Sequence, residues 1–548
     1  MRCANLVLSS SLAWASVQRS AAVAVGRATV PLLRSAQRRG PLTAARGVVC
    51  SAGPSGSALD GLQPSALEAD TIFALSSGAG VRAGVSVIRV SGPHAKLVLQ
   101  RMCPGGGGGD GLPPPRRAVL RSLRQPGSDT PPRHFPLVDQ ALVLWLPGPR
   151  SFTGEDTVEL HTHGSPAVVS ATLEALGRLS YHRLAEPGEF TRQAHANGRM
   201  DLTEVEALGD LINAQTDAQR RQALAAMGGG QRRSLEAWRG RMVRALAHTE
   251  ALIDFGEDAD DVTEAALSSA VGEMREIRRE IEAELEDGGR GEAVRDGVRV
   301  AILGPPNAGK SSLLNLLARR DAAIVSPIEG TTRDVVTVSL QLGGMPVVLS
   351  DTAGLRSDSE DPIERLGMVR SADEAAKAHV QLWVFDASTP VPPDADGVGA
   401  EATGGIAGAP LQLLLRNKVD LSRGGEGGAE GGDTAGGVPS ERQWRISCTT
   451  GEGVAPFLDQ LGGIVRRLYG SDEGETPLVT RARHRQHLEG CVAALAQFEE
   501  LASLGEAAPL DLACEELRTA SLELGRITGR VDVEEVLDVI FRDFCIGK

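Results

Sequence analysis

The residues from Gly304 to Ser311 have the types and spacing needed to hold the phosphates of a nucleotide. They read Gly-Pro-Pro-Asn-Ala-Gly-Lys-Ser and match the pattern G-x-x-x-x-G-K-[ST]. In such a loop the backbone N–H groups surround phosphate oxygens, the Lys310 ammonium reaches the β and γ phosphates, and the Ser311 hydroxyl coordinates Mg²⁺. The residues expected to contact the nucleotide are Asn307, Ala308, Gly309, Lys310, Ser311 and Ser312. Of these, we expect Asn307 and Lys310 also to act in catalysis.

The sequence on both sides of this loop predicts a strand before it and a helix after it. Residues 298–303 form a short apolar run typical of a buried strand, and Leu313, Leu314 and Leu317 recur at helical spacing. Strand, loop and helix in this order are the context in which the phosphate pattern functions. We therefore predict a nucleotide-binding α/β domain around this loop.

Two further segments supply groups for the metal and the γ phosphate. Asp351 and Gly354 follow an apolar strand at 347–349, which places a carboxylate near Mg²⁺ and a backbone amide near the γ phosphate. Thr332 lies in the run 330–334 and would add a second Mg²⁺ hydroxyl from a switch loop. The expected contacts from the first segment are Asp351, Thr352, Ala353 and Gly354.

A third group of residues predicts that the base is guanine. Asn417, Lys418 and Asp420 follow a strand at 411–415. A carboxylate at Asp420 accepts both N–H donors on the edge of guanine, which adenine does not offer, so GTP is preferred over ATP. The segment that would complete this base pocket is Ser447, Cys448 and Thr449.

The position that orients the attacking water in Ras-like GTPases holds no glutamine in this chain. That glutamine would follow Gly354, where the sequence has Leu355. Asn307 offers a carbonyl oxygen beside the β and γ phosphates, where with switch-loop carbonyls it would hold a monovalent cation in place of an arginine finger. This hypothesis predicts faster hydrolysis in K⁺ than in Na⁺. A domain that binds GTP without hydrolysing it is the alternative.

Several runs together resemble one family. The segment 306–315, the loop 330–334, the run 351–356 and the final four residues Cys-Ile-Gly-Lys look like the MnmE (TrmE) family of tRNA-modifying GTPases. The similarity extends from about Asp70 to Lys548. It includes the N-terminal runs 70–72, 151–156 and 187–190, which are similar to that family's folate-binding domain.

The resemblance implies an activity and its partners. Members of this family are homodimers that bind a tetrahydrofolate one-carbon derivative of the 5-formyl or methylene type and hydrolyse GTP in a K⁺-dependent way. With the FAD-dependent MnmG they add a carboxymethylaminomethyl-type group at C5 of the wobble uridine in tRNA. GTP hydrolysis would drive a rearrangement of the domains, bringing the tail thiol of Cys545 near the folate and the uridine.

The resemblance also implies roles for individual residues. Glu364 falls where the family positions the hydrolytic water, although this alignment needs a one-residue insertion. The positions corresponding to the family's K⁺ ligands are Asn307, Ser326, Ile328 and Thr331, and those corresponding to its Mg²⁺ ligands are Ser311 and Thr332. The folate contacts would be Arg89, Glu159, Arg199 and Lys548. The family's usual lysine is replaced by Arg199, which keeps the charge but changes the geometry.

A metal site is an alternative interpretation of the residues around Glu159. Alternation along a strand at 158–163 would place Glu159, His161 and His163 on one face. Fixed metal ligation would need a further ligand and supporting partners, which the sequence does not reveal. A carboxylate at Glu159 also suits the paired N–H donors of a pterin-like ring.

The chain is long enough for several domains. It has 548 residues, of which 41% are apolar and 23% charged, which excludes wholesale disorder. We expect an α/β multidomain protein with a folate-binding α/β domain at 69–190, a discontinuous helical domain at 191–293 and 471–548, and an inserted Ras-like P-loop GTPase domain at 294–470. Both helical segments are rich in Ala, Leu, Glu and Arg at helical spacing.

The first 59 residues differ from the rest of the chain. They hold seven arginines and no acidic residue, as in a transit peptide, so we expect import into a mitochondrion or chloroplast; a disordered native tail is the alternative. Residues 48–52 resemble a plastid processing site and favour the chloroplast. No run of 18 apolar residues occurs, which predicts that the chain does not span a membrane.

The formal net charge of −14 means that a nucleic acid must meet a local basic patch. The candidate patches are the arginines within 232–241 and within 481–485.

Two other functions remain open. A ribosome-assembly GTPase of the Era or Der kind has a similar nucleotide domain, but a KH-like RNA module or a second phosphate loop would be expected. A folate-dependent methyl or formyl transferase with a regulatory GTPase domain is the other alternative.

Overall fold

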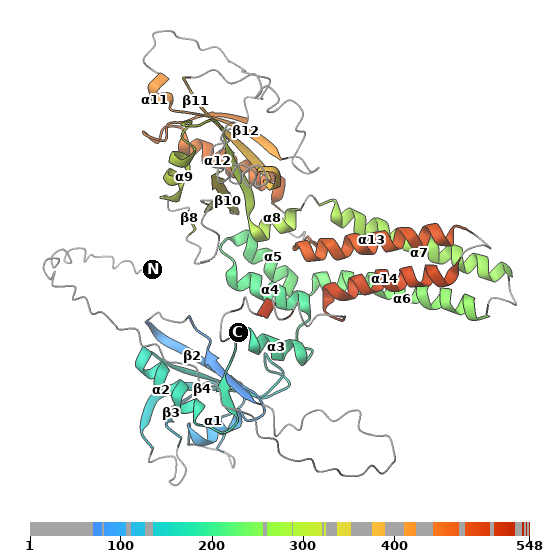
Figure 1. Cartoon of the computed structure of the whole chain (residues 1–548). Helices are drawn as coiled ribbons and strands as arrows, with labels where there is room; N and C mark the ends of the chain where they lie inside the picture. Colours follow the sequence, from blue (N-terminus) through green and yellow to red (C-terminus); the bar gives the residue numbers. More distant parts are fainter. Residues whose placement is uncertain are drawn as a thin grey trace, which may run out of the picture. The chain divides into compact units, whose positions relative to one another are not determined.

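The computed structural model describes most of the chain from residue 70 onward (Figure 1). The described residues are 70–78, 82–105, 111–126, 135–255, 260–287, 289–319, 323–324, 337–351, 375–388, 410–422, 442–470, 477–504, 509–531, 537, 540–541, 544 and 547. All contacts reported below lie within the compact unit Pro64–Lys548. The segment 1–59 lies outside the described residues.

The N-terminal domain is built on a six-stranded sheet in the order β3-β4-β5-β2-β1-β6. Its strands are β1 Thr71–Leu75, β2 Ala83–Ser91, β3 Val119–Arg124, β4 Leu137–Leu146, β5 Thr157–Gly164 and β6 His182–Leu184. Alternate side chains such as Val90 and Leu160 are buried with residues of the helices α1 Lys96–Arg101 and α2 Pro166–Gly177. On the other face, Phe190 of helix α3 Glu189–Ala196 packs on Ile72 of β1.

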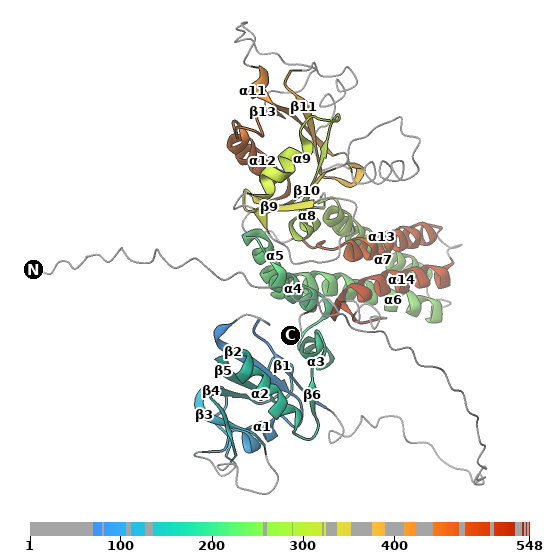
Figure 2. The same cartoon turned by 60° about the vertical axis from the view of Figure 1, so that its left-hand side comes forward.

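The helical domain combines two segments that are far apart in the sequence. The first contributes α4 Leu202–Asn213, α5 Asp217–Met227, α6 Gly230–Phe255, α7 Asp260–Leu285 and α8 Arg290–Asp296, and the second α13 Ala482–Ala502 and α14 Leu510–Thr528. Helices α6, α7, α13 and α14 lie side by side in Figures 1 and 2. They share one apolar core that includes Trp238, Ile277 and Phe498, which confirms that the helical domain is discontinuous.

The inserted domain has a seven-stranded sheet in the order β13-β12-β11-β7-β10-β9-β8. Its strands are β7 Val298–Leu303, β8 Ala323–Ile324, β9 Thr337–Leu342, β10 Met345–Asp351, β11 Val380–Asp386, β12 Leu411–Asn417 and β13 Gln443–Arg445. Its helices are α9 Lys310–Ala318, α11 Val419–Ser422 and α12 Val454–Tyr469. Strands β10, β7, β11, β12 and β13 pair in parallel, so their carboxyl ends meet at one edge. The predicted strand at 298–303 is confirmed.

Two carboxylates one turn apart on α4 hold the chain where it leaves and returns to the helical domain. Asp210 Oδ1 accepts hydrogen bonds from Arg295 Nε at 3.0 Å and from Arg481 Nη2 at 2.7 Å. Glu206 accepts from Arg483 Nη2 at 3.0 Å and contacts His484 Nε2 at 2.9 Å. Because Arg295 precedes β7 and Arg481 precedes α13, this network ties both connections of the inserted domain to one helix.

Glu206 is ionised although it is only 3% exposed. Burial alone would raise its pKa, but the hydrogen bond with His484 and the charges of Arg481 and Arg483 lower the pKa from 4.5 to about 2. Burial lowers the pKa of His484, and the hydrogen bond and charge of Glu206 oppose that shift.

Among the described helices, none combines the length and the apolar character needed to span a membrane.

The substitution Glu206→Ala should destabilise the helical domain by about 3–5 kcal/mol, because it removes the buried carboxylate that Arg483 and His484 bind and leaves a cavity. The pKa of Glu206 is lower in the folded state, so its contribution is present above about pH 4.5 and is lost as the pH falls through about 2. Thermal and denaturant unfolding at neutral pH measure the loss. Glu250→Ala, which removes an exposed partner of Arg518, is the matched control, and equal unfolding midpoints for both variants would contradict the assignment.

Candidate functional site

The phosphate loop lies between β7 and α9 and has no room for side chains at two glycines. Gly304 has φ +137°, and a Cβ there would run into the Val384 carbonyl of β11. Gly309 has φ +97°, and a Cβ there would overlap the amide of Asn417. Asn307 adopts a left-handed backbone with φ 62°, a conformation that non-glycine residues adopt mainly at turns and functional sites. The loop is therefore fixed from outside by β11 and β12.

Lys310 is held inside this loop. It is 7% exposed, and its Nζ donates hydrogen bonds to the carbonyl oxygens of Gly304 at 2.8 Å and Pro305 at 3.0 Å. Burial lowers the pKa of its ammonium group, and the nearby Asp351 carboxylate opposes that shift. The loop thus surrounds a positive charge with the backbone, an arrangement suited to anionic phosphates.

Ser311 and Asp351 meet at the carboxyl ends of β7 and β10. The Ser311 hydroxyl donates to Asp351 Oδ2 at 2.7 Å. The other oxygen, Oδ1, is buried and has no hydrogen-bond partner among the described residues. A hydroxyl and a carboxylate at one point are oxygen ligands that fit Mg²⁺. Ser312 follows on α9 and is exposed.

Asn417 joins the phosphate loop to the predicted base pocket. Its buried amide donates to the Ala308 carbonyl at 2.9 Å, and its Oδ1 accepts from the Cys448 backbone N–H at 3.1 Å. Burial raises the pKa of the Cys448 thiol to about 11, so the thiol is protonated at neutral pH. The two loops are therefore held in a fixed relative position by one side chain.

Asp420 carries a buried oxygen that is available to a ligand. Its Oδ1 has no hydrogen-bond partner in the described part of the chain. Lys418, with φ 64°, is anchored by its Nζ to Asp386 Oδ2 at 2.9 Å. This hydrogen bond, with others from Ser388, lowers the pKa of Asp386 to about 2. Ser447 and Thr449 flank Cys448; the Ser447 hydroxyl accepts from the Thr450 N–H at 3.1 Å, and Thr449 is exposed.

Arg89 and Glu159 meet on the sheet face of the N-terminal domain. They are register partners on β2 and β5, and Arg89 donates to Glu159 Oε1 from Nη2 at 3.0 Å and from Nε at 3.2 Å. The guanidinium also lies 5.3 Å from the Phe152 ring centre and 5.8 Å from that of Phe190. An ion pair beside two aromatic rings can hold a flat, polar ring system.

Arg199 and the C-terminal segment contact the same domain. A Cβ at Gly154, two residues after Phe152, would lie 3.3 Å from Arg199 Cγ. Ser76, just after β1, donates its hydroxyl hydrogen to the Gly547 carbonyl at 2.9 Å. The neighbouring strand β2 carries Arg89. Gly547, the residue before Lys548, therefore contacts the end of β1, and β1 pairs with the strand that carries Arg89.

The histidines on β5 do not form a metal site with Glu159 among the described residues. No group of three or more His, Cys, Asp or Glu able to hold a metal ion occurs in that part of the chain. His161 Nε2 lies 3.5 Å from Glu159 Oε2, and exposed His163 binds Asp139 with its Nδ1 at 2.8 Å. The metal interpretation therefore has no support from this geometry.

Arginines in both basic runs proposed from the sequence form ion pairs with carboxylates. Arg481 and Arg483 bind the α4 acids, and Arg485 binds Glu292 at 3.1 Å. Arg241 binds three glutamates, at positions 273, 276 and 280. Nucleic-acid binding by these runs stays a prediction, since the ion pairs reduce the positive charge that the runs present; spacing along one helix does not reveal partners that come from other helices.

Ten predicted functional residues lie outside the described residues: Ser326, Ile328, Thr331, Thr332, Thr352, Ala353, Gly354, Glu364, Cys545 and Lys548. No sequence pattern pointed to an individual role for Phe152, Phe190 or Asp386. Asp386 ends a buried strand, as Asp351 does, so the same strand-end rule would have found it. The two rings could be found only from the fold.

Comparisons with known proteins cover nearly all of the described chain. Residues 71–199 match the family described as GTP-binding protein TrmE N-terminus, and residues 202–545 match the MnmE helical domain. The tRNA modification GTPase MnmE of Paramagnetospirillum magneticum is 47% identical over 479 residues, which cover 87% of this chain and 100% of that protein. The human mitochondrial 5-taurinomethyluridine-[tRNA] synthase subunit GTPB3 is 46% identical over 487 residues, covering 87% and 93%.

These matches include the N-terminal and helical domains as well as the nucleotide-binding domain. The similarity of ribosome-assembly GTPases was expected in the nucleotide-binding domain alone, so the matches favour the other assignment. The phosphate loop, the buried Asp420 oxygen and the split helical domain agree with the same assignment. The chain belongs to the MnmE (TrmE) family of tRNA modification GTPases.

Proposed function

We propose that this protein works with an FAD-dependent MnmG-like partner to modify C5 of the wobble uridine in organellar tRNA. The two proteins use a tetrahydrofolate one-carbon unit of the 5-formyl or methylene type and add a carboxymethylaminomethyl-type group. The observation that carries the proposal is the Arg89–Glu159 pair between two aromatic rings, in a chain of this family. The human relative is named as a synthase subunit for 5-taurinomethyluridine, which supports a second subunit and a closely related product.

GTP hydrolysis in this proposal depends on two cations. Mg²⁺ is held by Ser311 and Thr332, and the contact between Ser311 and Asp351 supports its position. K⁺ is held by Asn307, Ser326, Ile328 and Thr331, and it supplies the positive charge of an arginine finger. Lys310 neutralises the phosphates, and Glu364 positions the water. The left-handed Asn307 supports this role, because it is the non-glycine residue of the loop that adopts a positive φ.

The folate site is proposed at the Arg89–Glu159 pair. Glu159 Oε1 is occupied by Arg89, while among the described residues Oε2 has His161 nearby, at 3.5 Å. A pterin ring could donate its N–H groups to that carboxylate. Arg199 and Lys548 would bind the anionic glutamate tail of the cofactor. The Gly547–Ser76 hydrogen bond supports a role for the C-terminal residue, because it anchors the neighbouring position at this domain.

Helix α4 offers a route by which GTP hydrolysis could rearrange the domains. A Cβ at Gly209 would lie 3.2 Å from the ring of Phe544, which immediately precedes Cys545. The next residue, Asp210, binds Arg295 and Arg481 on the two connections of the GTPase domain. A movement of those connections would shift Asp210 and, through the adjacent Gly209, the segment that carries Cys545.

A homodimer and an organellar location complete the proposal. Leu120 and Leu142, which pair across β3 and β4, are 63% and 47% exposed and form an apolar row on the sheet. Such a row supports pairing with a second copy. The mitochondrial location in the name of the human relative supports a mitochondrion, and the comparisons give the chloroplast no support.

Asp420→Asn should weaken GTP binding by about 100-fold, because the new amide group opposes a guanine donor and leaves it unsatisfied. Xanthosine triphosphate, which has a carbonyl at C2, should bind this variant better than it binds the unmodified protein. Nucleotide titration measures both affinities. Asp459→Asn, at an exposed position of α12, serves as the control; GTP affinity that is the same in both variants would contradict the role of Asp420.

GTP hydrolysis by the full chain should be about tenfold or more faster in K⁺ than in Na⁺, because the bound cation stabilises the transition-state charge. Asn307→Ala should remove most of this difference. Asn315→Ala, on the exposed face of α9, should preserve it. Steady-state hydrolysis at equal ionic strength provides the measurement, and equal rates in the two salts for the unmodified protein would rule out the cation.

Loss of the protein should leave the wobble uridines of organellar tRNA without their C5 group. Re-expression of the unmodified chain or of Glu174→Gln should restore the group, whereas Glu159→Gln should not, because an amide cannot balance Arg89 and accept two donors. Nucleoside analysis by mass spectrometry gives the readout, with GTP hydrolysis unchanged in both variants. Unaltered wobble uridines after loss of the protein would refute the proposed function.

A further inference from the structure

Positive charge is concentrated in the N-terminal domain of this acidic protein. The whole chain has a formal net charge of −14, yet residues 70–199 contain 14 Lys and Arg against 10 Asp and Glu. Within 232–241 and 481–485, every arginine except Arg233 has a carboxylate partner among the described residues. A polyanionic partner is attracted to the part of the surface where positive charge is not compensated, which directs attention to this domain.

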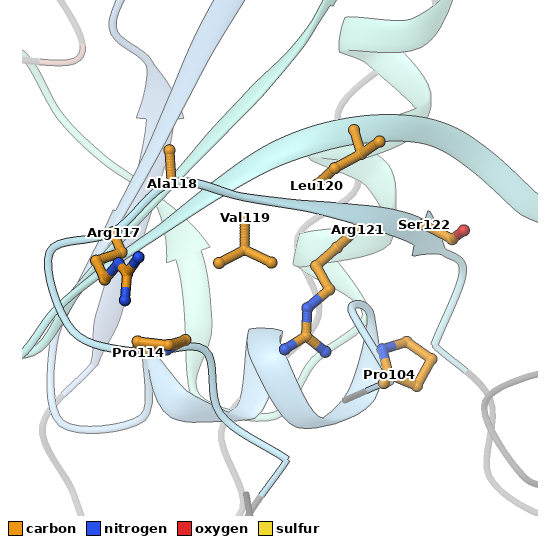
Figure 3. Close-up of a pocket in the computed structure, with 9 residues that line it drawn as sticks. Pro104, Pro114, Arg117, Ala118, Val119, Leu120, Arg121 and Ser122 are labelled. Atoms are coloured by element: carbon orange, nitrogen blue, oxygen red, sulfur yellow. The ribbon is translucent and has the colours of Figure 1, made fainter. Parts of the chain in front are cut away.

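A basic pocket lies at the edge of its sheet. In the order of the described strands, β3 stands at the end of the sheet beside β4, and a pocket of about 670 Å³ opens beside it. Figure 3 shows Arg117, Val119 and Arg121 on the same side of the strand, with Leu120 on the other side. The remaining lining residues are Pro104, Gly105, Pro114, Ala118 and Ser122, so no described residue that lines the pocket is acidic.

Arg116 lies in the turn before β3 and contacts the backbone of Arg150, which follows β4. Arg116 has φ 57°, and its Nη2 donates to the carbonyl oxygens of Arg150 at 2.8 Å and Pro147 at 3.3 Å. Carbonyl groups orient this guanidinium without cancelling its charge. Arg117 and Arg150 are exposed, and neither has a carboxylate partner among the described residues. Arg117 lines the pocket, Arg116 precedes it in the chain, and Arg116 contacts the backbone of Arg150, so three arginines without a described carboxylate partner are linked to this edge of the sheet.

We propose that the β3 arginine surface, formed by Arg116, Arg117, Arg121 and Arg150, binds the phosphate backbone of the tRNA. The inference rests on the proposed function in requiring that tRNA be the substrate. Guanidinium groups bind phosphate oxygens in pairs, and the apolar Val119, Pro104 and Pro114 offer a surface for a ribose or base. A partner with many phosphates engages all four arginines at once, whereas a small phosphorylated molecule would fill only the pocket.

The dependence of tRNA binding on salt tests this surface. In the full chain, Arg117→Ser together with Arg150→Ser should weaken tRNA binding and reduce the slope of log affinity against log salt by about 1.4–1.8, which corresponds to two lost phosphate contacts. The matched control is Arg466→Ser together with Arg467→Ser, at exposed positions of α12. That control should leave the slope unchanged. Both double variants should retain normal GTP hydrolysis and unfolding midpoints.

Three outcomes would overturn the inference. The first is an unchanged affinity and slope for the Arg117/Arg150 variant. The second is an equal loss in the α12 control, which would indicate only the effect of net charge. The third is a loss of inorganic phosphate binding with tRNA binding unchanged, which would indicate a small-anion site. In each case wobble-uridine analysis of the unmodified protein shows separately whether the proposed function still holds.

Discussion

The charged network on α4 is the interaction on which the arrangement of the inserted domain depends. Arg295, before the first strand of that domain, and Arg481, before the helix that follows it, bind the same oxygen of Asp210. Beside them, Glu206 stays ionised in a buried position. Removing both Arg481 and Arg483 would leave the buried Glu206 carboxylate without its arginine partners, which costs far more than losing a surface ion pair. The two connections are therefore held together by charge as well as by packing.

The nucleotide site follows a similar rule, in that one buried side chain fixes two loops. Asn417 binds the phosphate loop through Ala308 and the base-side loop through Cys448. Gly309 must lack a side chain because the Asn417 amide occupies that space. Loops that are already ordered lose little conformational freedom when a ligand binds. Asp351 and Asp420, at the two sides of this site, each keep a buried carboxylate oxygen without a partner among the described residues.

Charge is distributed unevenly because the acidic residues are used differently in each domain. In the helical domain they neutralise arginines of neighbouring helices, as Glu273 and Glu280 do for Arg241. In the N-terminal domain Glu159 is used at the paired site on the sheet, while Arg117 and Arg150 have no such partner among the described residues. A chain with a negative net charge can therefore contain both a helical bundle rich in paired acids and a sheet edge with unpaired arginines.

The sequence by itself determined the elements whose signal is local. The phosphate loop, the strand before it and the helical spacing after it lie within 20 residues of one another, and backbone geometry requires those residue types there. It also predicted that Glu159 and His161 share a strand face, since strand side chains alternate. Only the tertiary structure decided which arginines are neutralised and which rings flank Arg89. Arg481 finds its carboxylate 271 positions away, and no periodic spacing links residues that meet only when separate elements pack together.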